Sequence, residues 1–305
     1  MLDIKRLRLL AELSRRGTIA AVASALDLSP SAVSQQLAQL ERETGVLLLR
    51  KQGRTLTLLE PAKQLVRAAE QMLHDLEAAE AALHATQQEL TGSLRLAVFQ
   101  TALLALVPAA LLRLQRQHPK LRIEVVQHEP ETGLSETAAR AFDLVVAEQY
   151  PGHAAAHFSG LDRVSLLQDR IRLALPLTPE FAHVTAITAA AELPWVMEPR
   201  GAASRHWAEQ ACRIAGFEPD IRFETADLQA HVRLIETGNA VALLPGLVRV
   251  NAAHQMRLVD LPGDPRRHIF TATRRGAASH PAIQAVRAEL QEQSTQIMLQ
   301  LQQQK

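Results

Sequence analysis

Residues 18–41, TIAAVASALDLSPSAVSQQLAQLE, decide the fold of the N-terminal part of this chain. Thr18 can cap a helix that runs to about Leu26. Ser29-Pro30 begins the next helix, with a hydroxyl at the N-cap and proline at the first helical position. Only the three residues Asp27-Leu28-Ser29 separate the two helices. Two helices joined by so short a turn are typical of a helix-turn-helix.

The second helix of this pair is amphipathic. Val33, Leu37 and Leu40 share one face and would anchor the helix to its neighbours, which leaves the opposite face free. Short hydroxyl and amide side chains on a free face can bond to base edges or phosphates, and glutamine suits adenine in the major groove. The candidate DNA contacts are Thr18, Ser29, Ser31, Ser34, Gln35, Gln36 and Gln39. The alternative is an ordinary solvated face.

A short basic stretch follows the helices. Arg50, Lys51 and Arg54 surround Gly53 between two short apolar segments, as expected for a wing that touches phosphates, and Arg50 and Arg54 are its candidate contacts. Residues 1–58 hold nine Lys/Arg and five Asp/Glu, whereas residues 59–91 hold two and six. This distribution favours contact between the N-terminal segment and a polyanion.

Residues 60–90 are expected to form one long helix. Its apolar positions alternate in steps of four and three, which is the repeat of a coiled coil. A stripe of this length must be covered by the rest of the chain or by a second copy. The candidate dimerisation residues are Leu65, Ala69, Met72, Leu76 and Leu83.

The rest of the chain alternates strands and helices, which predicts an α/β fold with largely parallel sheets. Helices are expected over 103–117, 134–141, 204–215 and 228–237, and from about 281. Strands are expected over 94–99, 121–127, 142–147, 171–175, 195–197, 221–224, 240–243 and 269–273.

Other classes of protein are less consistent with the sequence. The chain has no GxGxxG, Walker or GxSxG motif, and no apolar run of about 20 residues that could span a membrane. His153 and His157 lie four residues apart without a CxxC or HExxH nearby, so no metal and no cofactor is expected. The lone Cys212 is interpreted as a core residue and fits a reducing compartment, so we expect a cytoplasmic protein. An enzyme, or a solute-binding protein that would explain only residues 92–305, remains the competing hypothesis.

Residues 3–66 resemble the N-terminal domain of the LysR-type transcriptional regulators. Thr18–Leu26 is similar to that family's second helix, Leu28–Glu41 to its recognition helix, and Gly45–Arg50 to the strand that follows. Less specifically, the resemblance extends over the whole chain. It implies a sequence-specific transcription regulator and no enzyme, with double-stranded DNA, a small-molecule effector and RNA polymerase as partners.

The resemblance also implies a multidomain fold and a homodimer, or a homotetramer built as a dimer of dimers. A winged helix-turn-helix would occupy residues 1–58 and the linker helix 59–91. Two Rossmann-like subdomains, similar to periplasmic solute-binding proteins, would follow: 92–165 with 266–305, and 166–265. The chain departs from the family at Leu58-Leu59-Glu60-Pro61-Ala62, where Leu59 replaces the usual capping threonine. Because Pro61 needs no amide partner and Glu60 favours the positive helix end, we expect the linker helix to form.

By the same resemblance, the effector lies between the two subdomains, in agreement with the rule that ligands sit beyond the carboxyl ends of strands. The start of a helix near Gly201 and Ser204 offers backbone donors for a small organic anion. The alternative is that Thr101, Ser204 and Asp227 are only helix caps, and that Arg200 and Arg205 are surface side chains. The candidate effector residues are Gln100, Thr101, Glu148, Gly201, Ser204, Thr225 and Pro245.

Overall fold

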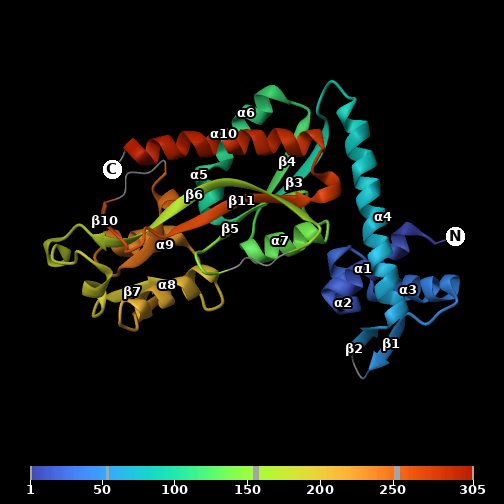
Figure 1. The fold of residues 1–305 in the computed structure, drawn as a ribbon, viewed down its shortest axis with the longest axis horizontal. Coiled ribbons are helices and arrows are strands. Elements are labelled where there is room, and N and C mark those ends of the chain that lie inside the picture. The colour runs from blue at the N-terminus through green and yellow to red at the C-terminus, as the bar shows by residue number, and fades with distance from the viewer. Residues whose placement is uncertain (1, 53–54, 154–157, 251–254, 304–305) are drawn as a thin grey trace.

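The computed structural model describes residues 2–52, 55–153, 158–250 and 255–303. A small head (residues 2–58) is joined through one long helix to a larger body (residues 92–303), as Figure 1 shows.

The head is built on three helices, α1 (Ile4–Arg16), α2 (Ile19–Ala25) and α3 (Pro30–Thr44). The predicted caps are confirmed: Thr18 Oγ1 accepts from the Ala21 amide at 3.2 Å, and Ser29 Oγ accepts from the Ala32 amide at 3.1 Å. Gly17 and Gly45 end α1 and α3 in the left-handed conformation, which glycine adopts at little cost.

An antiparallel hairpin completes the head, with β1 (Leu49–Gln52) paired to β2 (Thr55–Leu58). The Glu41 carboxylate of α3 accepts from the amides of Leu48 and Leu49 at 2.8 and 3.0 Å. This contact fixes the hairpin to the end of α3.

The linker helix α4 (Glu60–Ala85) begins where the sequence predicts, without a side-chain cap at Leu59. It ends five residues before the expected Leu90. The Thr86 hydroxyl donates to the Leu83 carbonyl at 2.8 Å, and the chain then turns toward Gly92, whose φ is +93°. The prediction of a helix to Leu90 is therefore wrong at its C-terminal end.

The body contains, within its described residues, a seven-stranded sheet in the order β10-β6-β11-β5-β3-β4, with β9 also paired to β6. Its strands are β3 (Gly92–Val98), β4 (Leu121–Gln127), β5 (Leu144–Gln149), β6 (Leu161–Pro176), β9 (Ala242–Pro245), β10 (Met256–Asp260) and β11 (Arg266–Arg274); β7 (Pro194–Met197) and β8 (Asp220–Glu224) form a parallel pair.

The expectation of largely parallel sheets is wrong. Within the seven-stranded sheet, β4 and β5 pair with β3 in parallel, whereas β6, β9, β10 and β11 form antiparallel ladders. The long strand β6 accounts for most of the antiparallel pairing, because it pairs with β11 over its first part and with β9 and β10 over its last part. The boundary expected after residue 165 falls inside this continuous strand. We call the elements around β3–β5 the first half of the body and those around β7–β10 the second half.

Helices cover both halves, and several differ from their expected bounds. They are α5 (Gln100–Ala105), α6 (Val107–Gln117), α7 (Pro130–Ala138), α8 (Ala203–Ile214), α9 (Leu228–Glu236) and α10 (Pro281–Gln303), with short 3₁₀ turns η1 (Pro179–Phe181), η2 (Ile187–Ala190), η3 (Gly246–Arg249) and η4 (Arg275–Ala277). The single helix expected over 103–117 is two, because Pro108 has no amide to continue α5. The helix expected over 134–141 starts at Pro130 and ends before Arg140, whose φ is +66°.

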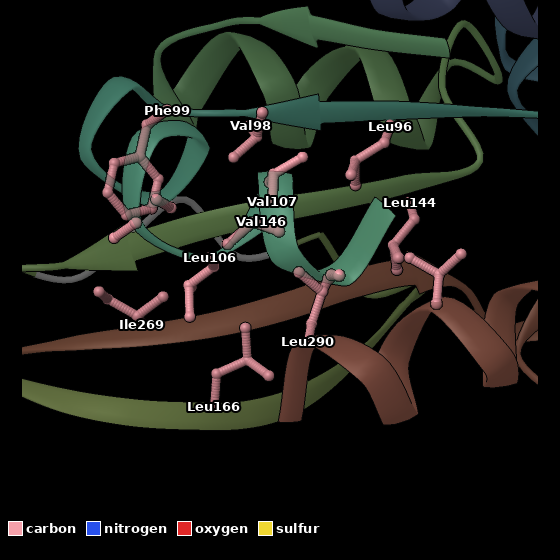
Figure 2. Packing of buried hydrophobic residues seen from close by; sticks show 14 of the residues in the cluster. Leu96, Val98, Phe99, Leu106, Val107, Leu144, Val146, Leu166, Ile269 and Leu290 are labelled. Carbon is pink, nitrogen blue, oxygen red and sulfur yellow. The ribbon is translucent and has the colours of Figure 1, made fainter. Parts of the chain in front are cut away.

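The largest core lies in the first half of the body. Figure 2 shows Leu96 and Val98 of β3, Val146 of β5 and Ile269 of β11 meeting Leu290 of α10. In Figure 1, α6 and α10 lie together along one side of this sheet, and α7 lies on the side nearer the head. Each fully buried aliphatic side chain of this kind contributes about 1.5–3 kcal/mol, so the first half is a firm platform for the residues at its strand ends.

Candidate functional site

The recognition face of the head is exposed on α3. Val33, Leu37 and Leu40 are buried against α1 and hold the helix in place. Ser34 and Gln35 point to solvent, and no hydrogen bond of their side chains is found within the described residues. The other predicted contacts Thr18, Ser29, Ser31 and Gln36 are also exposed, and Gln39 is half-buried.

Two of these glutamines are engaged within the head. Gln36 Oε1 accepts from Arg6 Nε at 2.9 Å, and Gln39 Oε1 accepts from Arg42 Nη2 at 2.6 Å. Arg6 also pairs with Glu43 at 2.5 Å. Sequence reasoning missed Arg6, because its partners lie about thirty residues further along the chain. The cluster fixes the amide orientation of both glutamines.

The β1–β2 hairpin follows α3 in the chain, as expected for a wing, and its first strand carries Arg50 and Lys51. Arg50 lies opposite Thr57 in the β1–β2 ladder, and both basic side chains are exposed. The remaining predicted wing contact, Arg54, lies outside the described residues.

The predicted dimerisation stripe on α4 divides into two parts. Ala69 is fully buried in the core of the head, and Leu65 packs beside that core. Met72, Leu76 and Leu83 are 47%, 46% and 69% exposed. The exposed apolar face therefore begins below the head, at Met72.

The head is tied to the first half of the body by ion pairs. Arg16 of α1 donates to both oxygens of Glu136 on α7, at 3.0 and 2.7 Å. The pKa of Arg16 is raised, chiefly by this hydrogen bond to Glu136. On α4, Glu77 pairs with Arg140 at 3.0 Å and with Arg274 at 2.6 Å. These contacts place α7 directly between the sheet and the head.

A cavity of about 320 Å³ lies between the two halves of the body. Its first wall is the start of α7 together with the end of β5, and its second wall is the segment from Glu198 to Ser204 with Ala226. Three predicted effector residues line it: Glu148, Gly201 and Ser204. Sequence reasoning missed Glu129, Glu131, Leu134 and Glu198, which also line it. Glu129 and Glu198 lie one or two residues beyond a strand, which could have indicated them, whereas Glu131 and Leu134 lie within α7 and carry no such signal.

The other predicted effector residues surround this cavity without lining it. Gln100 bridges the halves: its Nε2 donates to Asp227 Oδ1 at 2.8 Å, and its Oε1 accepts from the Leu228 amide at 3.0 Å. Thr225 Oγ1 accepts from the Asp227 amide at 3.1 Å. Pro245 is buried beside β6 and borders a second, small cavity of about 20 Å³.

Of the three residues interpreted as possible helix caps, Asp227 caps a helix, whereas Ser204 and Thr101 do not. Asp227 Oδ1 accepts from the Gln229 amide at 2.9 Å and caps α9; its pKa is lowered, first by the hydrogen bond from Gln100. Ser204 instead bonds to Glu198. Thr101, 1% exposed, accepts from Arg267 at 2.8 Å.

Arg267 is the centre of a buried ionic network behind the cavity. It is 1% exposed and donates to Asp169 at 2.7 and 2.9 Å, to Glu148 at 2.5 Å and to Thr101. A buried charge of this kind is tolerated only when its hydrogen bonds are satisfied. Arg205 is also buried, at 4% exposed, and its partners are Glu209, Glu224 and the Glu198 carbonyl. The expectation that Arg205 is a surface side chain is wrong. Arg200 is exposed, as expected.

Two carboxyl groups on the cavity wall are difficult to ionise. Burial, together with the neighbouring Glu148 and Glu129, raises the pKa of Glu198 to about 7. Burial also raises the pKa of Glu148, against the opposing effect of Arg267. Tyr150, next along from β5, has its pKa raised well above the usual value by burial.

The remaining candidate features support no catalytic site. Cys212 is buried in the second half, as expected for a core residue, and burial raises its pKa to about 12. His153 lines the cavity, whereas His157 lies outside the described residues. In the described part of the chain, no group of three or more His, Cys, Asp or Glu side chains is placed to hold a metal ion.

A larger cavity, about 660 Å³, opens on the outer side of α8 and is lined by Trp207, Ile214 and Leu261. It is lined by residues of the second half and by the loop after β5, and it shares His153 with the cavity between the halves. No helix among the described residues is long and apolar enough to cross a lipid bilayer.

Comparison with known proteins gives two family matches. Residues 87–295 match the family described as "LysR substrate binding domain", and residues 4–63 match "Bacterial regulatory helix-turn-helix protein, lysR family". The chain is 26% identical over 266 residues to the HTH-type transcriptional activator IlvY of Salmonella typhimurium, covering 84% of this chain and 86% of that protein. It is 25% identical over 248 residues to the malonate utilization transcriptional regulator of Klebsiella pneumoniae, covering 81% and 80%.

Solved structures share the fold. A cysteine variant of full-length OxyR from Pseudomonas aeruginosa superposes with a TM-score of 0.67 at 15% identity, covering 95% of each chain. Full-length CbnR in complex with its target DNA gives a TM-score of 0.53 at 19% identity, covering 96% of this chain and all of that one.

Proposed function

Because the chain belongs to the LysR family of transcription regulators, we propose that α3 and the β1–β2 hairpin read its operator while a small effector binds in the cavity between the halves of the body. The protein is a DNA-binding transcription regulator with an effector-binding domain, and it is not an enzyme. We divide the chain into a reader (1–58), a linker (59–91) and two effector-binding subdomains (92–165 with 266–305, and 166–265). It acts in the cytoplasm, with RNA polymerase as a further partner.

The observation that carries the DNA-reading proposal is the free, rigidly held face of α3. Ser34 and Gln35 are exposed on a helix whose opposite face is buried, and each is short enough to bond to a base edge. The clamped Gln36 and Gln39 amides flank them. Pre-set side chains lose less entropy on binding than free ones.

The test is operator selection from fragmented genomic DNA, followed by titration of the selected site. Gln35→Ala and Ser34→Ala should each reduce the preference for the selected site over random DNA by about 10-fold, since a base contact contributes about 1–3 kcal/mol. Arg50→Ala should weaken binding to both DNAs equally and reduce the salt dependence. Ser14→Ala, an exposed position on α1, is the control. Unchanged discrimination in the α3 variants would mean that another surface reads the DNA.

Two copies would pair through the exposed apolar face of α4. Met72, Leu76 and Leu83 lie in steps of four and seven, as a coiled-coil seam requires. Two heads per dimer would read half-sites about 34–36 Å apart. Membership of the same family is also the basis for proposing a homotetramer built as a dimer of dimers.

Effector binding would reach the head through α7. Glu131 at the start of α7 lines the cavity, and Glu136 on the same helix holds Arg16 of the head. Five residues of helix separate them, a rise of about 7.5 Å. A shift of α7 on effector binding would therefore act directly on the head. Couplings of this kind are typically about 1–3 kcal/mol, which changes DNA occupancy without abolishing it.

A further inference from the structure

The walls of the cavity between the two halves carry an excess of acidic side chains. Glu129, Glu131, Glu148 and Glu198 line it, against Arg200 and the half-buried His153. A site for an anion would need donors that are free to meet it, so the engagement of each donor near the cavity decides which charge the ligand carries.

The buried arginines near this cavity are already committed to protein carboxylates. Arg267 donates from all three of its guanidinium nitrogens, to Asp169, Glu148 and Thr101. Arg205 donates to Glu209 and to Glu224. An incoming carboxylate would have to break one of these pairs and leave a buried charge unpaired, which is strongly unfavourable.

The start of α8 is also engaged. The Ser204 hydroxyl in the first turn of α8 bonds to the carboxyl group of Glu198. A protein carboxyl group is thus already the partner of this hydroxyl, and an incoming anion would have to displace it. The hydroxyl expected to help hold a small anion therefore already faces an acid of the chain itself.

The lining acids other than Glu148, which pairs with Arg267, are poorly compensated. Repulsion from Glu148 and Glu129 adds to burial in raising the pKa of Glu198, and burial and Asp169 raise the pKa of Glu148 against Arg267. An added cation would relieve this repulsion, whereas an added anion would increase it. The described residues hold no group arranged for a metal ion, and Leu134, Pro199, Ala203 and Ala226 give the cavity apolar wall as well.

We propose that this cavity binds a cationic organic molecule, an aliphatic amine or guanidine whose charged end lies among Glu129, Glu131 and Glu198 and whose carbon chain packs on Leu134 and the alanines. The proposal rests on the proposed role of the cavity as the effector site. It replaces the small organic anion expected from the sequence.

The test uses the full-length protein and titrates it with four-carbon probes of different charge: 1,4-diaminobutane, butylamine, 1,4-butanediol and succinate. Binding is followed by calorimetry at pH 6 and pH 8. The amines should bind, and the diol and succinate should not. Glu131→Gln should weaken amine binding about 10-fold, because a hydrogen bond to a charged group contributes about 1.5–3 kcal/mol. The matched control is Glu192→Gln, an exposed acid that does not line the cavity.

The pH dependence gives a second readout. Glu198 is faced by Glu148, Glu129 and Arg267, with Glu131, His153 and Arg200 on the same walls. Because its pKa is about 7, it is mostly protonated at pH 6 and mostly ionised at pH 8. An amine stays charged at both values, so its affinity should rise about 10-fold between them. Glu198→Gln should remove this rise.

Ala226→Trp, which fills the cavity, separates the two ways in which the proposal can fail. Succinate binding that is lost in Ala226→Trp would keep the cavity as the effector site and overturn the cationic ligand. Amine binding that survives Ala226→Trp would place the site elsewhere and overturn both proposals. No binding by either amine would overturn the cationic ligand, and so would amine affinity that is equal at pH 6 and pH 8.

Discussion

Glu198→Gln should stabilise the protein, and the gain should depend on pH. The carboxyl pKa is about 7 in the folded chain against 4.5 in its ordinary state, because the group is buried among other acids. Below pH 4.5 the carboxyl is protonated in both states and folding meets no penalty. Between pH 4.5 and 7 the unfolded chain ionises first. Above pH 7 the folded chain carries the full cost of the buried charge.

The size of the effect follows from the pKa difference. At about 1.4 kcal/mol per pKa unit, a shift from 4.5 to about 7 corresponds to roughly 3 kcal/mol at pH 8.5 and less than about 1 kcal/mol at pH 5. The side chain is half-buried, so solvent screening makes the larger figure an upper bound. Gln keeps the shape and an oxygen that can accept from Ser204, so the substitution removes the charge and little else.

Urea unfolding followed by tryptophan fluorescence measures this directly, since Trp195 is fully buried in the same half of the body as Glu198. The free energy of unfolding of Glu198→Gln should exceed that of the wild type by about 2–3 kcal/mol at pH 8.5 and converge with it near pH 5. Glu192→Gln, an exposed acid, should change neither value. A gain of equal size at both pH values would refute the reasoning, because a change in packing would not follow the titration.

Three further outcomes are expected. Met72→Asp with Leu76→Asp should give monomers in sedimentation velocity, because two charges would replace apolar side chains that are 47% and 46% exposed in one chain; persisting dimers would exclude this face. Arg16→Ala and Glu136→Ala should each reduce the effector-induced change in operator affinity. The double variant should reduce it little further, because the pair acts as one bidentate contact. Additive losses would show that the two residues act independently. Gly276→Ala should destabilise the protein by about 1–3 kcal/mol in thermal unfolding, because its Cβ would come within 2.5 Å of a carbonyl oxygen of α4; an unchanged transition would mean that α4 is not packed there.

The elements that the sequence predicts well are those fixed by local contacts. Thr18 and Ser29 bond to amides three residues away, so their caps can be read directly from the sequence. Gly17 and Gly45 end their helices for an equally local reason. The strand-end rule also placed Glu148 and Ser204 at the cavity correctly, because it depends only on the order of strands and helices.

Features that depend on distant partners could not be predicted in this way. Arg267 is paired with Asp169 and Glu148, which lie 98 and 119 residues away in the sequence. No local pattern marks an arginine in a strand as buried, and a surface side chain is the usual interpretation. The prediction of parallel strands is wrong for the same reason, because the antiparallel pairing of β6 with β11 joins segments about a hundred residues apart.

The position of α7 gives a physical reason why a charge in the cavity could change DNA binding. Gly133 packs α7 so closely on the sheet that a Cβ there would lie 2.9 Å from the Val145 side chain. The helix therefore has no room to move closer to the sheet. Its end is held by Arg274, which donates to the Thr137 carbonyl at 3.0 Å and also pairs with Glu77 of α4. A cation that draws Glu131 toward Glu198 would pull α7 along its axis. Both Glu136 and the Arg274 contact would then shift against the head and the linker together.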